Sequence, residues 1–95
     1  MEAFAGEVLT ACRTKYANAC LVTARLSADL RAEPTYQILL NGAGDLSTFI
    51  SLRADSMGIM LIIKSDVLRC ISSKNEKQAM DMLQEWLAQV KLSCN

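Results

Sequence analysis

The sequence predicts an α+β fold, an open-faced two-layer sandwich in which helices cover one face of an antiparallel sheet. Two segments repeat apolar residues at helical spacing, other segments alternate apolar and polar residues, and turn-forming residues separate them. The expected order of elements is strand, helix, strand, strand, helix, strand, helix. A chain of 95 residues suffices for a single domain over residues 1–95, and no linker or internal repeat divides it.

The first two elements are expected within residues 3–30. Residues 3–11 contain the short apolar run EVLTA and are expected to form a strand. From residue 14 to about residue 30, small or apolar side chains recur every three or four positions, which is typical of one helical face. This set comprises Ala17, Cys20, Leu21, Ala24 and Ala28. The helix should end at RAEP, because the residue before a proline is displaced from the helical region.

The middle of the chain is expected to form a hairpin and a short helix. TYQILLNG (35–42) and LSTFISL (46–52) have the pattern of two strands, and NGAGD (41–45) supplies residues that tolerate positive φ. The segment from residue 55 to about residue 64 is expected to be a short apolar helix, although its run MLII would equally fit a strand. A turn at KSD then leads to a last strand, VLRCIS (67–72).

The last helix has the clearest local signal. SKNE (73–76) matches a capping box, in which the Ser73 hydroxyl accepts from the amide three residues on and Glu76 reaches back. The helix then places apolar residues on one stripe that should cover the sheet. They are Ala79, Met82, Leu83, Trp86, Leu87 and Val90. Trp86 is interpreted as a core anchor.

Composition argues against several classes of function. Ten cations balance ten anions and the pI is about 6.2, so neither nucleic acid nor an anionic membrane is an expected partner. The four cysteines form no metal or redox motif, and no cofactor or metal is expected. Cys20 and Cys70 are interpreted as small core residues. No secretory signal is visible and the run MGIMLII is too short to span a bilayer, so a cytoplasmic location is expected.

Three stretches resemble HPr, the histidine phosphocarrier of the bacterial sugar phosphotransferase system. RTKYANACLVTA (13–24) is similar to the HPr active-site helix, and LRADSMGIM (52–60) to its regulatory helix. LRCISSKNEKQAMDMLQEWL (68–87) resembles its final strand, turn and helix. The resemblance implies the HPr element order and a docking face for enzyme I and the sugar-specific proteins. A protein partner is therefore expected, with an oligomeric state that the resemblance leaves open.

The position of the HPr histidine is occupied by arginine. Aligned on the apolar stripe, Arg13 stands in the place of the histidine, Lys15 in that of the arginine and Tyr16 in that of the proline, with Thr14 and Ala17 completing the motif. A guanidinium stays protonated and has no free lone pair to attack a phosphoryl group. Since the chain contains no histidine, phosphate relay by this route is excluded.

The regulatory helix implied by the resemblance also lacks its serine. Asp55 or Ala54 takes that position, depending on the alignment, and Ser56 follows. Asp55 is interpreted as a helix N-cap, with crude mimicry of a phosphoserine as the alternative. By resemblance, the expected partner surface consists of Met57, Gly58, Ile59 and Met60.

A helix that starts at residue 13 would offer an anion site. Free amides and the positive end of the helix dipole would join Arg13, Thr14 and Lys15, and the same field would lower the pKa of Cys12. The alternative is that the two cations are solvated surface residues.

The expected function is that of a non-catalytic, HPr-like binding or regulatory protein. No histidine, phosphate-binding glycine loop or recognisable carboxylate pair suggests an enzyme. Two alternatives are an unrelated two-layer interaction or dimerisation module, and a small-anion-binding domain at the start of the first helix.

Overall fold

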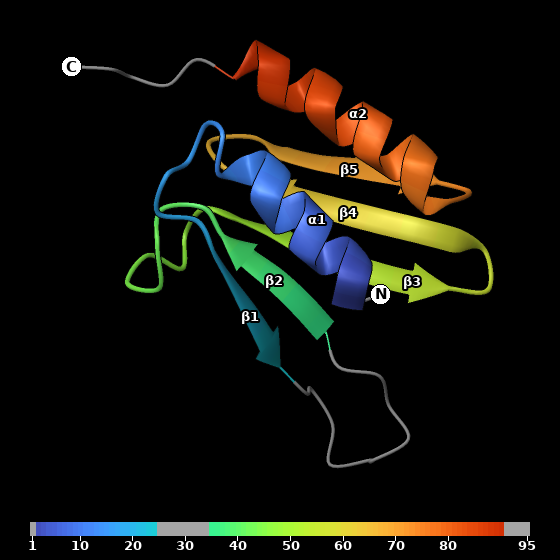
Figure 1. Cartoon of the computed structure of the whole chain (residues 1–95), viewed down its shortest axis with the longest axis horizontal. Coiled ribbons are helices and arrows are strands. Elements are labelled where there is room, and N and C mark those ends of the chain that lie inside the picture. Colours follow the sequence, from blue (N-terminus) through green and yellow to red (C-terminus); the bar gives the residue numbers. More distant parts are fainter. Residues whose placement is uncertain (1, 25–34, 91–95) are drawn as a thin grey trace.

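The chain folds into five antiparallel strands and two helices, seen in a computed structural model that describes residues 2–24 and 35–90. The elements are α1 (Glu2–Cys12), β1 (Cys20–Ala24), β2 (Thr35–Leu39), β3 (Phe49–Asp55), β4 (Gly58–Lys64), β5 (Leu68–Ser73) and α2 (Glu76–Gln89). Each strand pairs with the next along the chain, giving the sheet order β1-β2-β3-β4-β5. Both helices lie on one face of the sheet, with α2 along β5 (Figure 1).

The α+β class, with an open antiparallel sheet, is confirmed, whereas the expected order of elements is wrong. The observed order is one helix, five strands and one helix. It also differs from the order that the HPr resemblance implies.

The N-terminal segment is the first difference, because residues 3–11 belong to α1 and not to a strand. The buried residues of α1 are Phe4, Ala5, Val8 and Cys12. Their separations of one, three and four residues are helical. The short run EVLTA contains too few of these positions to show the pattern.

The expected helix over residues 14–30 is also wrong. Residues 13–19 form turns and β1 follows, while residues 25–34 lie outside the described part of the chain. β1 pairs with β2, and Leu21, opposite Ile38, packs against the core. The segment is rich in small side chains, which fit a helical stripe and a strand equally well.

The expected helix over residues 55–64 is β4, which follows β3 after a two-residue turn at Ser56 and Met57. Leu61 and Ile63 face the helices and are fully buried. Met60 and Ile62 lie on the opposite face and are apolar as well. Because both faces of β4 are apolar, the alternation that usually reveals a half-buried strand is hidden.

Three expected elements are confirmed. The hairpin over residues 35–52 is present as β2 and β3, and Gly42 in its loop has a φ of 100°. The strand expected at residues 67–72 is β5, and the last helix is α2.

The start of α2 differs from the expected capping box. The N-cap is Asn75, whose Oδ1 accepts from the N–H of Gln78 at 2.8 Å, while Gln78 Oε1 accepts from the N–H of Lys74 at 3.0 Å. Ser73 is buried at the end of β5, where its hydroxyl lies 3.3 Å from the carbonyl oxygen of Ile59. The cap therefore lies two residues further along, and only Lys74 and Asn75 connect β5 to α2.

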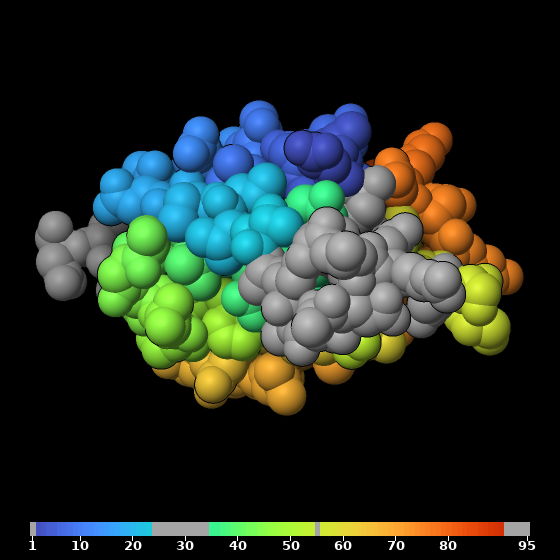
Figure 2. All heavy atoms as spheres, turned by 90° about the horizontal axis from the view of Figure 1, so that it is seen from below, coloured from blue at the N-terminus to red at the C-terminus, as the bar shows by residue number. Residues whose placement is uncertain are grey.

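The core lies between the helices and the sheet face that they cover. Val8 of α1, Leu61 of β4 and Leu83 of α2 are fully buried members of one apolar cluster. Burial of each such side chain stabilises the fold by about 1.5–3 kcal/mol. Figure 2 views the two layers from the β1 side, with α1 in dark blue above strands in cyan and green.

The opposite sheet face is covered by neither helix. One row of side chains crosses all five strands on this face: Val22, Gln37, Ser51, Ile62 and Cys70. In the row, Gln37 Nε2 donates to Ser51 Oγ at 3.1 Å. In the neighbouring row, Lys64 Nζ lies 5.9 Å from the centre of the Phe49 ring. This face thus combines apolar side chains with a polar contact and a cation–π contact.

Replacing Gly58 with alanine is expected to destabilise the fold by at least about 2 kcal/mol. Gly58 has a φ of 138°, and a Cβ there would overlap the backbone carbonyl oxygen of Ser73. Gly44→Ala is the control, because a Cβ at Gly44 meets nothing within 4 Å. Urea unfolding measures both variants. An unchanged midpoint for Gly58→Ala would contradict the close packing of the β3–β4 turn against the end of β5.

Candidate interaction site

Residues 13–17, expected to begin a helix, form the turn that follows α1. The N–H of Lys15 donates to the carbonyl oxygen of Cys12 at 3.1 Å. Arg13 Nε donates to the carbonyl oxygen of Ala19 at 3.1 Å. Arg13 therefore holds the path of the chain from α1 into β1.

The expected helix N-terminus at these residues is wrong. They follow the C-terminal end of α1, where the helix dipole places partial negative charge. The Thr14 hydroxyl donates to the carbonyl oxygen of Ala11 at 2.7 Å, and the Thr14 N–H donates to the same oxygen at 3.2 Å. The N–H of Tyr16 donates to the carbonyl oxygen of Cys12 at 2.8 Å. Neither the amides nor the dipole is arranged for an anion, and Ala17 is an exposed turn residue.

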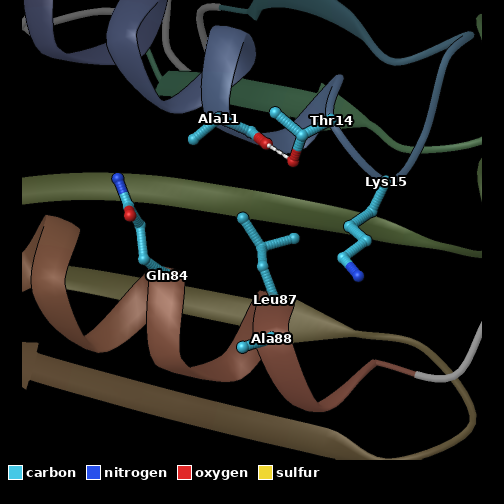
Figure 3. A pocket seen from close by; sticks show the side chains of 6 residues that line it. All are labelled: Ala11, Thr14, Lys15, Gln84, Leu87 and Ala88. Carbon is cyan, nitrogen blue, oxygen red and sulfur yellow. Dashed lines mark hydrogen bonds between the residues drawn. The ribbon is translucent and has the colours of Figure 1, made fainter.

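Thr14 and Lys15 line a hollow between the C-terminal parts of the two helices (Figure 3). Its volume is about 240 Å³, and its lining residues are Ala11, Thr14, Lys15, Gln84, Leu87 and Ala88. Lys15 is the only charged residue among them. No carboxylate or imidazole lies beside Lys15 among these lining residues.

Cys12 is the last residue of α1 and is fully buried in the core. Burial raises the pKa of its thiol to about 12. The expectation that a helix N-terminus would lower this pKa is wrong, because Cys12 lies at the opposite end of a helix. Burial also raises the pKa of the Tyr16 phenol, and a negative charge on Cys12 would raise it further.

The residues expected at the start of the second helix surround the β3–β4 turn instead. Ala54 and Asp55 are the last residues of β3, and Ser56 is in the turn. Asp55 pairs with Gly58 across the hairpin. The N-cap interpretation of Asp55 is therefore wrong, since no helix begins there.

The expected partner surface over residues 57–60 is divided between different parts of the molecule. Met57 is 86% exposed in the turn, Met60 is 37% exposed on the sheet face opposite the helices, and Ile59 is buried in the core. With Gly58, these residues line only a small hollow of about 80 Å³ near the end of β5. They do not form one continuous helical face.

A larger recess, which sequence analysis missed, lies between β5 and the outer side of α2. It comprises two hollows of about 410 and 270 Å³ that share Arg69, Trp86 and Gln89. We call this recess the edge groove, and its lining residues are Tyr16, Ser65, Asp66, Val67, Arg69, Cys70, Ile71, Met82, Glu85, Trp86, Gln89 and Val90.

Trp86 is the central side chain of the edge groove. Its ring stacks on that of Tyr16, with ring centres 6.5 Å apart and an angle of 11° between the planes. Trp86 packs against the core but is only half-buried. The expected core anchor is therefore also part of an open surface.

The sequence does contain a signal for the α2 wall of this groove. Met82, Trp86 and Gln89 are separated by four and three residues, so they share one helical face. This face is adjacent to the fully buried stripe formed by Ala79, Leu83 and Leu87. In this second stripe Met82 and Trp86 are half-buried and Gln89 is exposed, so α2 presents apolar side chains beside its contact with the sheet.

The β5 wall of the groove is an unpaired edge of the sheet. Within the described part of the chain, β5 pairs only with β4, so alternate backbone N–H and C=O groups on its other side are open to a partner. Val67 and Leu68 are 70% and 65% exposed. Cys70 is also exposed, so its interpretation as a core residue is wrong, and Cys20 is half-buried.

Reactive clusters are not found in the parts of the chain that the structure describes. Over residues 2–24 and 35–90, histidine, cysteine, aspartate and glutamate side chains do not gather in threes that could hold a metal ion. Over the same residues, neither helix is long and apolar enough to cross a bilayer. The edge groove is the feature from which a function can be inferred.

Raising the pH above about 9 is expected to destabilise the protein through Cys12. Its thiol has a pKa of about 12 in the fold against an ordinary value of 9.0, so the unfolded chain loses this proton first. The free energy of unfolding should fall by up to about 1.4 kcal/mol per pH unit between pH 9 and 12, with no contribution below pH 9. Urea unfolding at pH 8, 9 and 10 measures this slope, and Cys12→Ala should reduce it. Equal slopes for the two proteins would contradict the prediction.

Comparison with known protein families, curated proteins and solved structures found no match. The function must therefore be inferred from the arrangement of the residues themselves.

Proposed function

We propose that the protein is a non-catalytic interaction module that binds a protein partner through the edge groove. The observation that carries this proposal is the β5 edge, which no described strand pairs, beside the half-buried Trp86. An unpaired strand and an adjacent aromatic recess are the two parts that recognition by strand addition requires.

Strand addition explains how each wall of the groove would contribute. A partner segment in extended conformation forms backbone hydrogen bonds with β5, which provide affinity with little dependence on sequence. Side chains of the partner that point toward α2 meet Trp86 and Met82. Aromatic residues dominate binding energy at many interfaces, and the flexible thioether adapts to different shapes. The groove would thereby select among partner sequences.

The charge of the molecule is compatible with a protein partner. Ten cations balance ten anions over the whole chain. The groove itself contains Arg69 together with Asp66 and Glu85, so neither sign dominates it. Such a mixed surface suits a protein segment better than a polyanion, which requires a basic footprint.

The proposal takes up the second of the expected functions, an interaction module unrelated to the phosphotransferase system. The HPr docking face requires the active-site helix and the regulatory helix side by side. Here Arg13 lies in a turn after α1, and residues 57–60 lie in a β-hairpin. Neither helix of that docking face is present at these residues.

A photo-crosslinking amino acid at Met82 is expected to form covalent adducts with protein in the cells that make this chain. Met82 lines the edge groove, so a bound partner would lie within reach of the reactive group. Leu46 is the control position, because it is 71% exposed in the β2–β3 loop and lies outside the groove. Adducts are read by mass spectrometry. Absence of adducts at Met82, or equal yields at both positions, would contradict the proposed function.

A further inference from the structure

We propose that the occupant of the edge groove is a second copy of this chain, paired through β5 about a two-fold axis at Cys70. This inference rests on the proposed function and names the partner. Antiparallel pairing of β5 with its copy would join two five-stranded sheets into one sheet of ten strands. The α2 helices of the two copies would then lie on the same side of that sheet, next to the axis.

Exposure favours β5 over the other sheet edge. Among the described residues, five large apolar side chains are exposed: Leu46, Met57, Met60, Val67 and Leu68. Two of them, Val67 and Leu68, lie in or next to β5, and none lies in β1. Natural edge strands are usually protected by proline, lysine or a bulge. β5 has none of these over Leu68–Ser73, and Arg69 is its only charged residue.

The register follows from the two faces of β5. Ile71 points to the helices, whereas Leu68 and Cys70 belong to the opposite face of the sheet. The side chains of opposed residues in an antiparallel pair lie on the same face of the sheet. A pairing of all six residues would place Leu68 opposite Ser73, and these two residues belong to different faces of β5. Pairing about Cys70 keeps the faces matched.

One other matched register, with its axis at Ile71, has the same number of pairs. It would leave Leu68 outside the pairing and place Arg69 opposite Ser73, at the far end of the strand. Pairing about Cys70 includes Leu68 and places Arg69 opposite Ile71 of the copy. The axis at Cys70 therefore covers more of the exposed apolar surface.

Charge complementarity supports a second copy as the occupant. Arg69 and Glu85 both line the groove, and neither forms an ion pair with a described residue. In the register about Cys70, Arg69 lies opposite Ile71 of the copy, which lines the same hollow as Glu85. Arg69 of each copy would thus lie near Glu85 of the other copy, which gives two equivalent charge pairs related by the axis. This self-complementary arrangement is what a two-fold interface requires.

The first test uses sedimentation equilibrium of the purified chain over a range of concentrations. The wild type is expected to dimerise, while Arg69→Glu and Glu85→Arg each weaken the dimer at least about tenfold. The double variant R69E/E85R should recover most of the affinity, because the charge pair is restored in reverse. Circular dichroism checks that each variant is folded. A monomeric wild type, or a dimer that is indifferent to these charges, would overturn the proposal.

The second test uses Cys70 to verify the register. Opposed residues in an antiparallel pair have Cα atoms about 4.5–5.5 Å apart, which lies within the range for a disulfide. Mild oxidation with copper phenanthroline should therefore link the two copies through Cys70, as shown by peptide mapping, and Cys70→Ser should abolish that link. A dimer in which Cys70 does not crosslink would overturn the pairing about this axis.

The adducts formed at Met82 separate this inference from the proposed function. Adducts of the chain with itself support both. Adducts only with a different protein would leave the interaction module standing and remove the second copy as its occupant. A monomeric chain without adducts at Met82 would overturn both.

Discussion

The architecture depends on one constraint: each strand pairs with its neighbour along the chain, which leaves the first and last strands at the edges of the sheet. β5 is the last strand, and only two residues separate it from α2. A helix with so short a connection packs beside the strand that it has just left. An edge strand, open on one side as far as the structure describes the chain, thus lies next to a helix, and the edge groove is the space between them.

Local signals predict only part of this fold. The β2–β3 hairpin, β5 and α2 follow from turn residues, alternation and an apolar stripe, all of which are contained in short segments. β1 is rich in small residues that suit either a helix or a strand, and β4 is apolar on both faces. Their conformation is decided by tertiary packing, which overrides local pattern. The groove escapes sequence analysis for the same reason, since Tyr16 and Trp86 meet only in three dimensions.

The types of the residues at a site do not by themselves determine what those residues do in the fold. Arg13, Thr14 and Lys15 suggest an anion site only if a helix begins there. At the end of α1, Arg13 and Thr14 donate to backbone carbonyl groups, and Lys15 lines a hollow whose other lining residues are uncharged. For Trp86 the sequence pattern suggests a buried core residue, whereas the structure shows a half-buried side chain that lines the edge groove.

The strand order has a consequence for how the protein is made. Every strand contact joins neighbours in the chain, so successive hairpins can form as synthesis proceeds, and folding should be rapid for a sheet of this size. β5 and α2 emerge after the other elements. Until they do, β4 is the open edge and its apolar residues are unprotected. The edge groove can therefore form only after β1 to β4 have been synthesised, because both of its walls belong to β5 and α2.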